Sequence, residues 1–244
     1  AMPAEKQARC IFEYIYFART DSTIDGVNVY HSRILAGKAL AESYPVEADL
    51  VVGVPDSGLV AAKGYSEQSG IPYGMAFHKN SYVGRTFIKP KQSQRESSVK
   101  IKLNVIEEVV RGKRIVMVDD SIVRGTQLRE TTEFLYASGA KEVHIRPACP
   151  PLLFGCKYLN FSRSTSEMEL ITRRVIQELE GGDPTKEVLA EYADPDSEKY
   201  AAMVEKIGEK LHFTSLRYHR LDDMIASVGI PADQLCTYCW NGKE

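Results

Sequence analysis

The stretch "IVMVDDSIVRGT" at residues 115–126 decides the fold, because it joins a buried strand to a polar loop and a helix. Four apolar residues lead directly into two adjacent carboxylates, Asp119 and Asp120, and a Ser, an Arg, a Gly and a Thr follow within six positions. Two neighbouring carboxylates repel one another, and removing either from water is unfavourable without a compensating group. We therefore expect the pair to bind a partner.

A second stretch, "ADLVVGVPDSG" at residues 48–58, has the same order of an apolar run and a polar turn. Neither run alternates apolar and polar residues, so we expect both faces of each strand to be covered. Further elements are expected from periodicity and from glycine stop signals. They are helices over 58–69 before Gly70, over 126–138 before Gly139 and over 26–43 with Asp25 as a cap, and short strands near 73–77 and 143–145. The alternation predicts an α/β fold with a doubly wound, mostly parallel sheet.

The C-terminal part has a different pattern and predicts a helical, Cys-containing extension from residue 156 onward. Ser166 and Glu169 form a possible capping box for a helix over "EMELITRRVIQEL" (167–179). The polar segment 180–199 predicts a connection with a short helix, and the tail from residue 216 predicts a strand, a helix and a Cys-rich end. The expected organisation is a segment 1–25, a core 26–155 and an extension 156–244.

Composition excludes several classes of protein. The 244 residues are 43% hydrophobic and 26% charged, with a net charge of −2, which argues against a protein that coats nucleic acid by bulk charge. No apolar run approaches the ~18 residues that span a bilayer, and the first ten residues lack the apolar core of a signal peptide. Five cysteines in such a chain fit the reducing cytoplasm.

The strand-end residues have the chemistry of a sugar-phosphate site. The loop after Asp120 leads into a helix, so its backbone N–H groups and the helix's positive end can face a phosphate. Gly125 permits a close approach, and the hydroxyls of Ser121 and Thr126 can donate to phosphate oxygens. The carboxylates then suit sugar hydroxyls or a divalent cation. A solvated acidic turn is the alternative for Asp119 and Asp120 taken alone, and neither a P-loop nor a dinucleotide fingerprint occurs.

Several motifs together resemble a known family. "VMVDDSIVRGT" looks like the phosphoribosylpyrophosphate (PRPP) binding motif of type I phosphoribosyltransferases, and "EYIYFAR", "VVGVPDS" and "YVGRTFI" extend the match. Together they resemble the amidophosphoribosyltransferase family, from Cys10 to Cys239. The resemblance implies a type I phosphoribosyltransferase fold and a Mg²⁺-dependent glycosyltransferase that makes 5-phosphoribosylamine and pyrophosphate from PRPP and ammonia, the first step of purine nucleotide synthesis.

The resemblance also implies roles for individual residues. Asp119 and Asp120 would hold the ribose hydroxyls and, with Ser57, bind Mg²⁺. The loop that would hold the 5′-phosphate consists of Ser121, Ile122, Val123, Arg124, Gly125 and Thr126. The loop that would hold the pyrophosphate consists of Val54, Pro55, Asp56 and Ser57, for which a plain turn is the alternative.

Residues 79–104 contain seven Lys or Arg and one Glu, a net charge of +6 in an acidic chain. So long a connection within a compact domain predicts a flexible lid. The alternatives are a solvated surface loop and a nucleic-acid patch, although one Tyr and one Phe are few for base stacking. The resemblance implies a loop that closes over PRPP, with Lys79, Tyr82 and Arg85 as catalytic residues that offset charge on the departing pyrophosphate.

The cysteines predict a metal site. Cys236 and Cys239 form a C-x-x-C pair, a common half-site for zinc or an iron–sulfur cluster, although alone the pair could be structurally idle. The resemblance implies a [4Fe–4S] cluster held by Cys10, Cys156, Cys236 and Cys239, with a Zn²⁺ site as the rival. Cys149 is left over and is expected to be a buried structural thiol.

The resemblance further implies partners. Whole relatives carry an N-terminal glutaminase domain that supplies ammonia, so we expect this chain to be the transferase part alone. Relatives are also homo-oligomers inhibited by nucleotides. Two other readings stay open, namely a PRPP- or nucleic-acid-binding regulator without catalysis and a base-salvage phosphoribosyltransferase.

Overall fold

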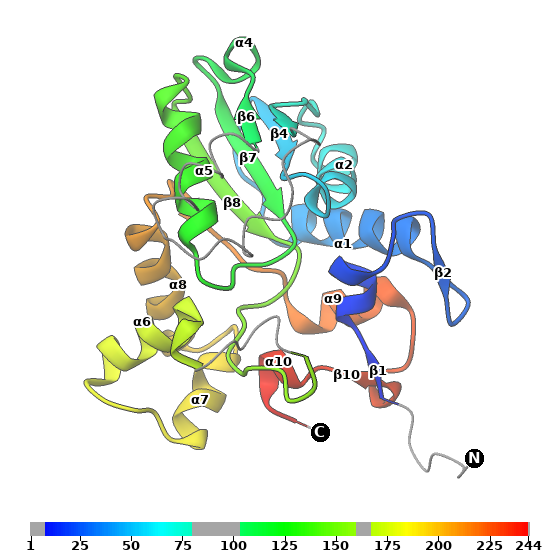
Figure 1. Cartoon of the computed structure of the whole chain (residues 1–244), viewed down its shortest axis with the longest axis vertical. Coiled ribbons are helices and arrows are strands. Elements are labelled where there is room, and N and C mark those ends of the chain that lie inside the picture. Colours follow the sequence, from blue (N-terminus) through cyan, green and yellow to red (C-terminus); the bar gives the residue numbers. More distant parts are fainter. Residues whose placement is uncertain (1–7, 80–102, 160–166, 244) are drawn as a thin grey trace, which may run out of the picture.

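A four-stranded parallel sheet forms the core of the upper half of the molecule as drawn in Figure 1. The computed structural model describes residues 8–79, 103–159 and 167–243. The sheet has the order β4 (Leu50–Gly53), β7 (Arg114–Asp119), β8 (Glu142–Pro147) and β9 (Ser215–Leu216). Val51 pairs with Val116, and Val116 with His144, so the strands end at the same edge. The predicted parallel α/β sheet is confirmed.

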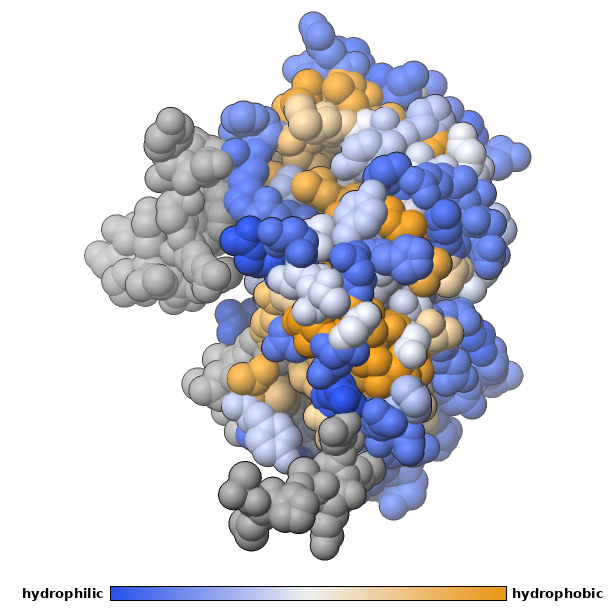
Figure 2. All heavy atoms as spheres, turned by 90° about the vertical axis from the view of Figure 1, so that its right-hand side faces the viewer, coloured by the Kyte–Doolittle hydropathy of each residue, from blue (hydrophilic) through white to orange (hydrophobic). Residues whose placement is uncertain are grey.

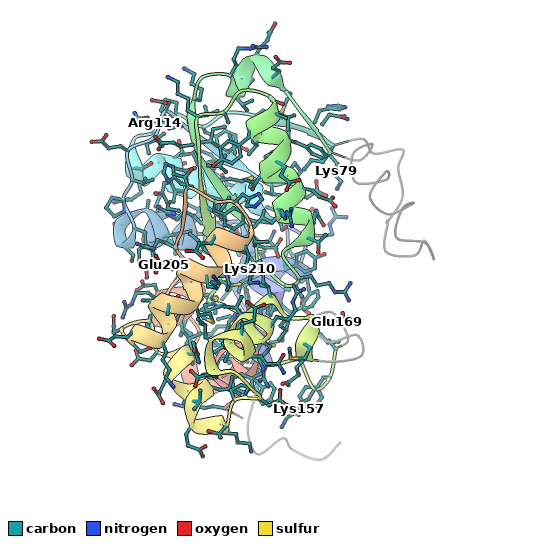
Figure 3. The ribbon with its side chains drawn as sticks, turned by 90° about the vertical axis from the view of Figure 1, so that its left-hand side faces the viewer. Lys79, Arg114, Lys157, Glu169, Glu205 and Lys210 are labelled. Atoms are coloured by element: carbon teal, nitrogen blue, oxygen red, sulfur yellow. The ribbon has the colours of Figure 1, made fainter. Side chains whose placement is uncertain are left out.

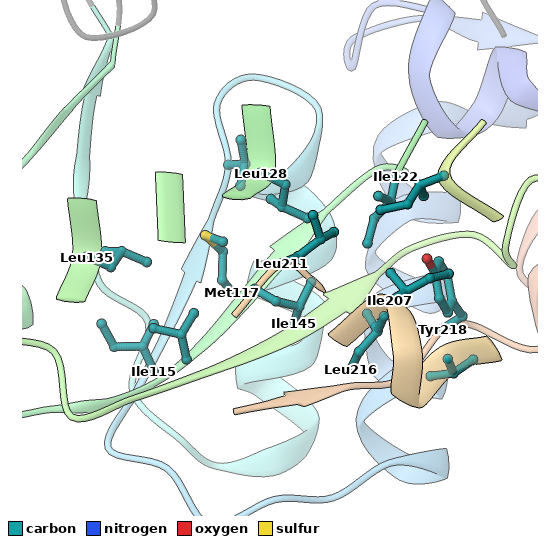
Figure 4. Close-up of a cluster of buried hydrophobic side chains, with 14 of the residues drawn as sticks. Ile115, Met117, Ile122, Leu128, Leu135, Ile145, Ile207, Leu211, Leu216 and Tyr218 are labelled. Carbon is teal, nitrogen blue, oxygen red and sulfur yellow. The ribbon is translucent and has the colours of Figure 1, made fainter. Parts of the chain in front are cut away.

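The two faces of β7 belong to different cores, as its lack of alternation predicts. Ile115 and Met117 are fully buried in a cluster with α5 (Thr126–Ala137) and α8 (Glu198–Lys210), shown in Figure 4. Val116 and Val118 are equally buried on the opposite face, in a cluster with α1 (Val29–Ser43) and α2 (Gly58–Ser69). Covering both faces fixes the strand in place and leaves only its end free for polar residues.

Close packing of α1 on α2 requires small residues. A Cβ atom at Gly37 of α1 would lie 1.9 Å from the carbonyl oxygen of Ala61 in α2, and one at Gly64 would lie 2.2 Å from that of Ile34. The backbones therefore touch, which holds α2 and the turn before it firmly against the sheet. Figure 2 shows the side of the molecule that carries α1, where apolar patches lie among hydrophilic residues. The large side chains of Tyr30 and Leu35 in α1 are exposed.

The C-terminal part wraps back onto the core and onto the N-terminal segment. Its elements are η3 (Glu167–Glu169), α6 (Ile171–Glu180), α7 (Lys186–Ala193), α8, β9, α9 (Leu221–Val228), η4 (Ala232–Gln234), β10 (Leu235–Cys236) and α10 (Tyr238–Asn241). β10 pairs in parallel with β1 (Arg9–Cys10), and this pair, with η1 (Glu13–Phe17), closes a separate apolar cluster. Strand β9 adds an edge to the main sheet, so the extension contributes to the core.

Some local predictions hold and others are wrong. Helix α2 ends before Gly70 as predicted. The helix predicted over 26–43 begins at Val29, and Asn28 caps it by accepting a hydrogen bond from His31 N at 2.9 Å. Asp25 instead occupies, with φ 51°, the turn between β2 (Thr23–Ile24) and β3 (Val27–Asn28).

The strand predicted near 73–77 begins only at the end of that range. It is β5 (Phe77–Lys79), which pairs antiparallel with β6 (Leu103–Val105), and the short α4 (Glu107–Val110) follows. Ser166, one half of the predicted capping box, lies outside the described residues, and α6 begins at Ile171 without a side-chain cap. Within the described residues, no helix is both long and apolar enough to cross a membrane.

Candidate active site

The two polar loops meet at the carboxyl ends of β4 and β7. The Ser57 hydroxyl donates to Oδ1 of Asp120 at 2.5 Å, and the Val54 N–H donates to the carbonyl oxygen of Val118 at 2.9 Å. A Cβ atom at Gly58 would lie 2.5 Å from the same carbonyl, so only glycine lets the turn come this close. The structure therefore brings Ser57, Asp119 and Asp120 together at one sheet edge, where open α/β sheets bind ligands.

The loop that the sequence predicts to hold the 5′-phosphate, residues 121–126 and here called the phosphate loop, is anchored by its apolar side chains. Ile122 is 2% exposed and belongs to the main core, the cluster that contains Ile115 and Met117. Val123 packs against the separate apolar cluster closed by β1, β10 and η1. Gly125 has φ 80°, a conformation that favours glycine, and Thr126 begins α5 with an exposed side chain. The anchors leave the exposed Thr126 hydroxyl for a ligand, whereas the Ser121 hydroxyl donates to Asp120.

The two adjacent carboxylates repel one another. Burial, and then the neighbouring Asp120, raise the pKa of Asp119 well above its usual range. The carboxylate of Asp120 accepts hydrogen bonds from Ser57 and from Ser121, both at 2.5 Å, and neither aspartate forms an ion pair within the described chain. Two partly buried carboxylates beside hydroxyl groups are ligands that Mg²⁺ prefers, so the residues present fit this ion.

Sequence reasoning missed a buried arginine, Arg33, which lies close enough to Asp120 to interact with it electrostatically. Arg33 is 5% exposed and donates to the carbonyl oxygens of Tyr14 at 2.8 Å and Ala18 at 3.0 Å. Burial lowers the pKa of Arg33, whereas its attraction to Asp120 raises it. A cavity of about 10 Å³, roughly the room for one water, has Arg33 and Ser57 in its lining. Arg33 thus adds positive potential without contacting the carboxylate.

Of the three predicted catalytic residues, the structure describes one. Lys79 ends β5, and its ammonium group forms an ion pair with the carboxylate of Asp56 in the loop predicted to hold pyrophosphate, here called the pyrophosphate loop. Tyr82 and Arg85 lie outside the described residues, as does most of the basic loop 79–104. Figure 3 shows Lys79 and Glu169 on the same side of the molecule.

Residues from the extension contact the phosphate loop. Glu169 of η3 forms an ion pair with Arg124, and Arg174 of α6 donates to the Arg124 carbonyl oxygen at 2.7 Å. The Ile171 N–H donates to the carbonyl oxygen of Val123 at 2.8 Å. These partners are about 50 residues apart in sequence, and no local pattern predicted them.

The four predicted metal-binding cysteines converge from distant parts of the chain. Cys10 pairs in register with Cys236 between β1 and β10. The pKa of Cys10 is raised to about 11, chiefly by burial and to a smaller extent by its neighbours Cys236 and Cys156. Burial likewise raises the pKa of Cys239, and the nearby Cys156, Cys10 and Cys236 raise it as well. Even so, no group of three or more His, Cys, Asp or Glu in the described chain is arranged ready to hold a metal ion.

The Cys156 sulfur accepts two backbone hydrogen bonds, from the N–H groups of Tyr158 at 3.4 Å and Leu159 at 3.3 Å. Such bonds are common around cluster sulfurs. Cys149 is 0% exposed, and burial raises its pKa, so the prediction of a buried thiol is confirmed.

The chain is similar to known proteins over most of its length. A phosphoribosyl transferase domain matches residues 29–149. The chain is 43% identical over 235 residues to an amidophosphoribosyltransferase of Mycobacterium tuberculosis, covering 96% of this chain and 40% of that protein. It is 52% identical over 176 residues to one of Archaeoglobus fulgidus, covering 72% of this chain and 38% of that protein.

A solved structure of glutamine PRPP amidotransferase from B. subtilis, complexed with ADP and GMP, is 38% identical to the chain. It superposes with a TM-score of 0.75, over 100% of this chain and 48% of that one. The fold and the two strand-end loops define a type I phosphoribosyltransferase. Within that class the chain belongs to the amidophosphoribosyltransferase family, and it spans less than half the length of the curated relatives that it matches.

Proposed function

We propose that the chain is the transferase part of an amidophosphoribosyltransferase, which joins ammonia to PRPP. The observation that supports this most directly is the hydrogen bond from Ser57 to Asp120, which unites the proposed pyrophosphate loop with the proposed ribose-binding carboxylates. A site with these two loops suits a substrate that carries a phosphate, a sugar diol and a pyrophosphate. The reaction opens purine nucleotide synthesis.

The proposed chemistry is a displacement at the anomeric carbon of ribose. The nitrogen lone pair of ammonia forms the new C–N bond while the C–O bond to pyrophosphate breaks, and the nitrogen then loses a proton to solvent. Mg²⁺, held by Asp119, Asp120 and Ser57, would neutralise charge on the pyrophosphate. The phosphate loop would orient the ribose, and Lys79, with Tyr82 and Arg85, would stabilise the departing pyrophosphate. No side chain acts as a nucleophile.

We further propose that Cys10, Cys156, Cys236 and Cys239 hold a [4Fe–4S] cluster, with Zn²⁺ as the rival. Four converging cysteines, two of them in paired strands, match the ligand number of a cluster. The cluster would tie segment 1–25 to extension 156–244 around the core 26–155. Its role would be structural, because it supplies no atom to the displacement.

The proposed partners follow from the relatives. In the whole protein, a glutaminase domain would supply the ammonia, and a homo-oligomer in the cytoplasm would be inhibited by nucleotides. The solved B. subtilis relative is complexed with ADP and GMP, which supports nucleotide regulation. Loop 79–104 would close over PRPP.

Pyrophosphate release tests the proposal. The chain is incubated with PRPP and Mg²⁺, and with ammonium, with glutamine or without a nitrogen donor. We expect release with ammonium and not with glutamine. PRPP binding without release under any condition would identify a non-catalytic regulator instead, and release stimulated by a purine base would identify a salvage enzyme.

A further inference from the structure

The phosphate loop is held from outside the core by the start of helix α6. Two consecutive loop carbonyls point to donors of this helix, because Val123 O accepts from the Ile171 N–H at 2.8 Å and Arg124 O accepts from Arg174 Nη2 at 2.7 Å. The Arg124 side chain is tied to Glu169, two residues before the helix. One short segment therefore fixes both the backbone and a side chain of the loop.

Fixing two carbonyls also fixes two N–H groups. In a trans peptide the C=O and the following N–H point in opposite directions, and Pro55–Asp56 is the single cis peptide in the described chain. With the carbonyls of Val123 and Arg124 turned toward α6, the N–H groups of Arg124 and Gly125 point away from α6. Successive N–H groups that point the same way form an anion-binding concavity. In the part of the chain that the structure describes, no backbone carbonyl accepts from the Gly125 N–H.

Helix α6 is itself held firmly by the core, so it can fix the position of the phosphate loop. Its Ile171, Val175 and Ile176 are buried in the main core. Thr172 Oγ1 donates to the Leu152 carbonyl oxygen, and Arg173 Nη1 donates to that of Leu153 at 3.3 Å. Arg174 is therefore presented to the loop from a helix that is fixed on its other sides.

Contact between α6 and the loop is close at the glycine. A Cβ atom at Gly125 would lie 2.8 Å from Ile171 Cδ1 and 3.0 Å from Leu211 Cδ1. The loop thus has little freedom on the side of α6, and a change of its peptide orientation would have to break the two hydrogen bonds.

We propose that Arg174 is a positioning residue for the phosphate loop, which sets the Arg124–Gly125 peptide so that its N–H faces the 5′-phosphate of the substrate. The proposal rests on the proposed function, because it assigns a support to the same PRPP site. It predicts that Arg174 affects binding of the 5′-phosphate and leaves the pyrophosphate loop, on the neighbouring strand β4, unaffected.

The test uses Arg174→Met and Arg174→Lys in the full chain with Mg²⁺. Calorimetry measures the binding of ribose 5-phosphate and of pyrophosphate separately, and steady-state assays with ammonium give kcat and KM for PRPP. We expect Arg174→Met to weaken ribose 5-phosphate binding and to raise KM about three- to tenfold, the loss expected for one hydrogen bond. Pyrophosphate affinity and kcat should stay within about twofold, and Arg174→Lys should recover most of the loss.

Lys210→Met is the matched control. Lys210 is an exposed cation of α8 that pairs with Glu178 of α6 at 2.9 Å, so its loss removes a contact to the same helix without touching the loop. Equal weakening of both ligands by Arg174→Met, or weakening by Lys210→Met as well, would overturn the proposal in favour of a purely structural role. Unchanged ribose 5-phosphate binding in Arg174→Met would also overturn it. If the wild-type chain bound neither ligand, the proposed function itself would fail.

Discussion

The Ser57 hydroxyl lies 2.5 Å from Oδ1 of Asp120, although 63 residues separate them in the chain. Strands β4 and β7 are parallel neighbours, and their register brings the two following loops to one edge. The hydrogen bond joins the proposed pyrophosphate loop to the carboxylate pair. The two halves of the proposed site are therefore organised by the sheet.

Replacing either strand-end carboxylate should lower the catalytic activity and leave the chain folded. Asp119→Asn and Asp120→Asn are each expected to lower PRPP-dependent pyrophosphate release about 100-fold or more, because each removes a proposed ligand of Mg²⁺ and the ribose hydroxyls. Asp119→Asn should leave Tm unchanged or higher, since it removes repulsion from Asp120 and the unfavourable burial of a charge. Activity assays and thermal unfolding check both expectations. A drop in Tm with retained turnover would show that the pair is structural.

The ion pair between Lys79 and Asp56 predicts that replacing its two residues changes pyrophosphate affinity in opposite directions. Lys79→Met should weaken pyrophosphate binding about tenfold, because it removes a cation beside the pyrophosphate loop. Asp56→Asn should strengthen it about two- to fivefold, since it frees the ammonium group and removes a negative charge near an anionic ligand. Calorimetry with pyrophosphate and Mg²⁺ measures both changes. Lys63→Met, which removes an exposed lysine of α2 that pairs with Glu67, is the control. A loss of affinity in Asp56→Asn would show that the carboxylate itself supports the ligand.

The features of the fold that could be predicted from the sequence are those that local residue patterns determine. The strand-end loops, helix α2 with its stop at Gly70 and the buried faces of β7 all follow from apolar runs and glycines. The choice of Asn28 over Asp25 as a cap could not be predicted, because the β2–β3 hairpin takes Asp25 out of the helix. Arg174 and Glu169 escaped prediction for a different reason, since their contacts to Arg124 exist only after α6 packs on the core. Such pairs depend on tertiary packing, and no periodic pattern in the sequence indicates them.

The cysteine site predicts a sharp contrast among the five thiols. Cys236→Ser should abolish iron binding, because it removes one of the four proposed ligands, and it should lower Tm by releasing the paired strands β1 and β10. Cys149→Ser is the matched control, since this thiol is fully buried and lies outside the proposed ligand set. Anaerobic purification followed by iron, sulfide and zinc analysis gives the measurement. About four irons and four sulfides per chain are expected. One zinc without iron would replace the cluster with a Cys₄ zinc site.

Buried His219 predicts how stability depends on pH. The side chain is 1% exposed, its Nε2 lies 3.1 Å from the carbonyl oxygen of Ala36, and burial lowers its pKa from 6.5 to about 4 despite the nearby Asp223. Between these two values the unfolded chain binds a proton that the folded chain does not, so stability is full above about pH 6.5 and falls as the pH drops toward 4. The loss amounts to roughly 3 kcal/mol at its limit. Asn can donate to the same carbonyl without titrating. As the pH falls, the unfolding free energy of the wild type should therefore decrease more than that of His219→Asn. Urea unfolding at pH 7, 6 and 5 measures it, with the exposed His31→Asn as the control. A difference that stayed constant over this range would show that His219 takes up a proton in the folded chain as readily as in the unfolded one.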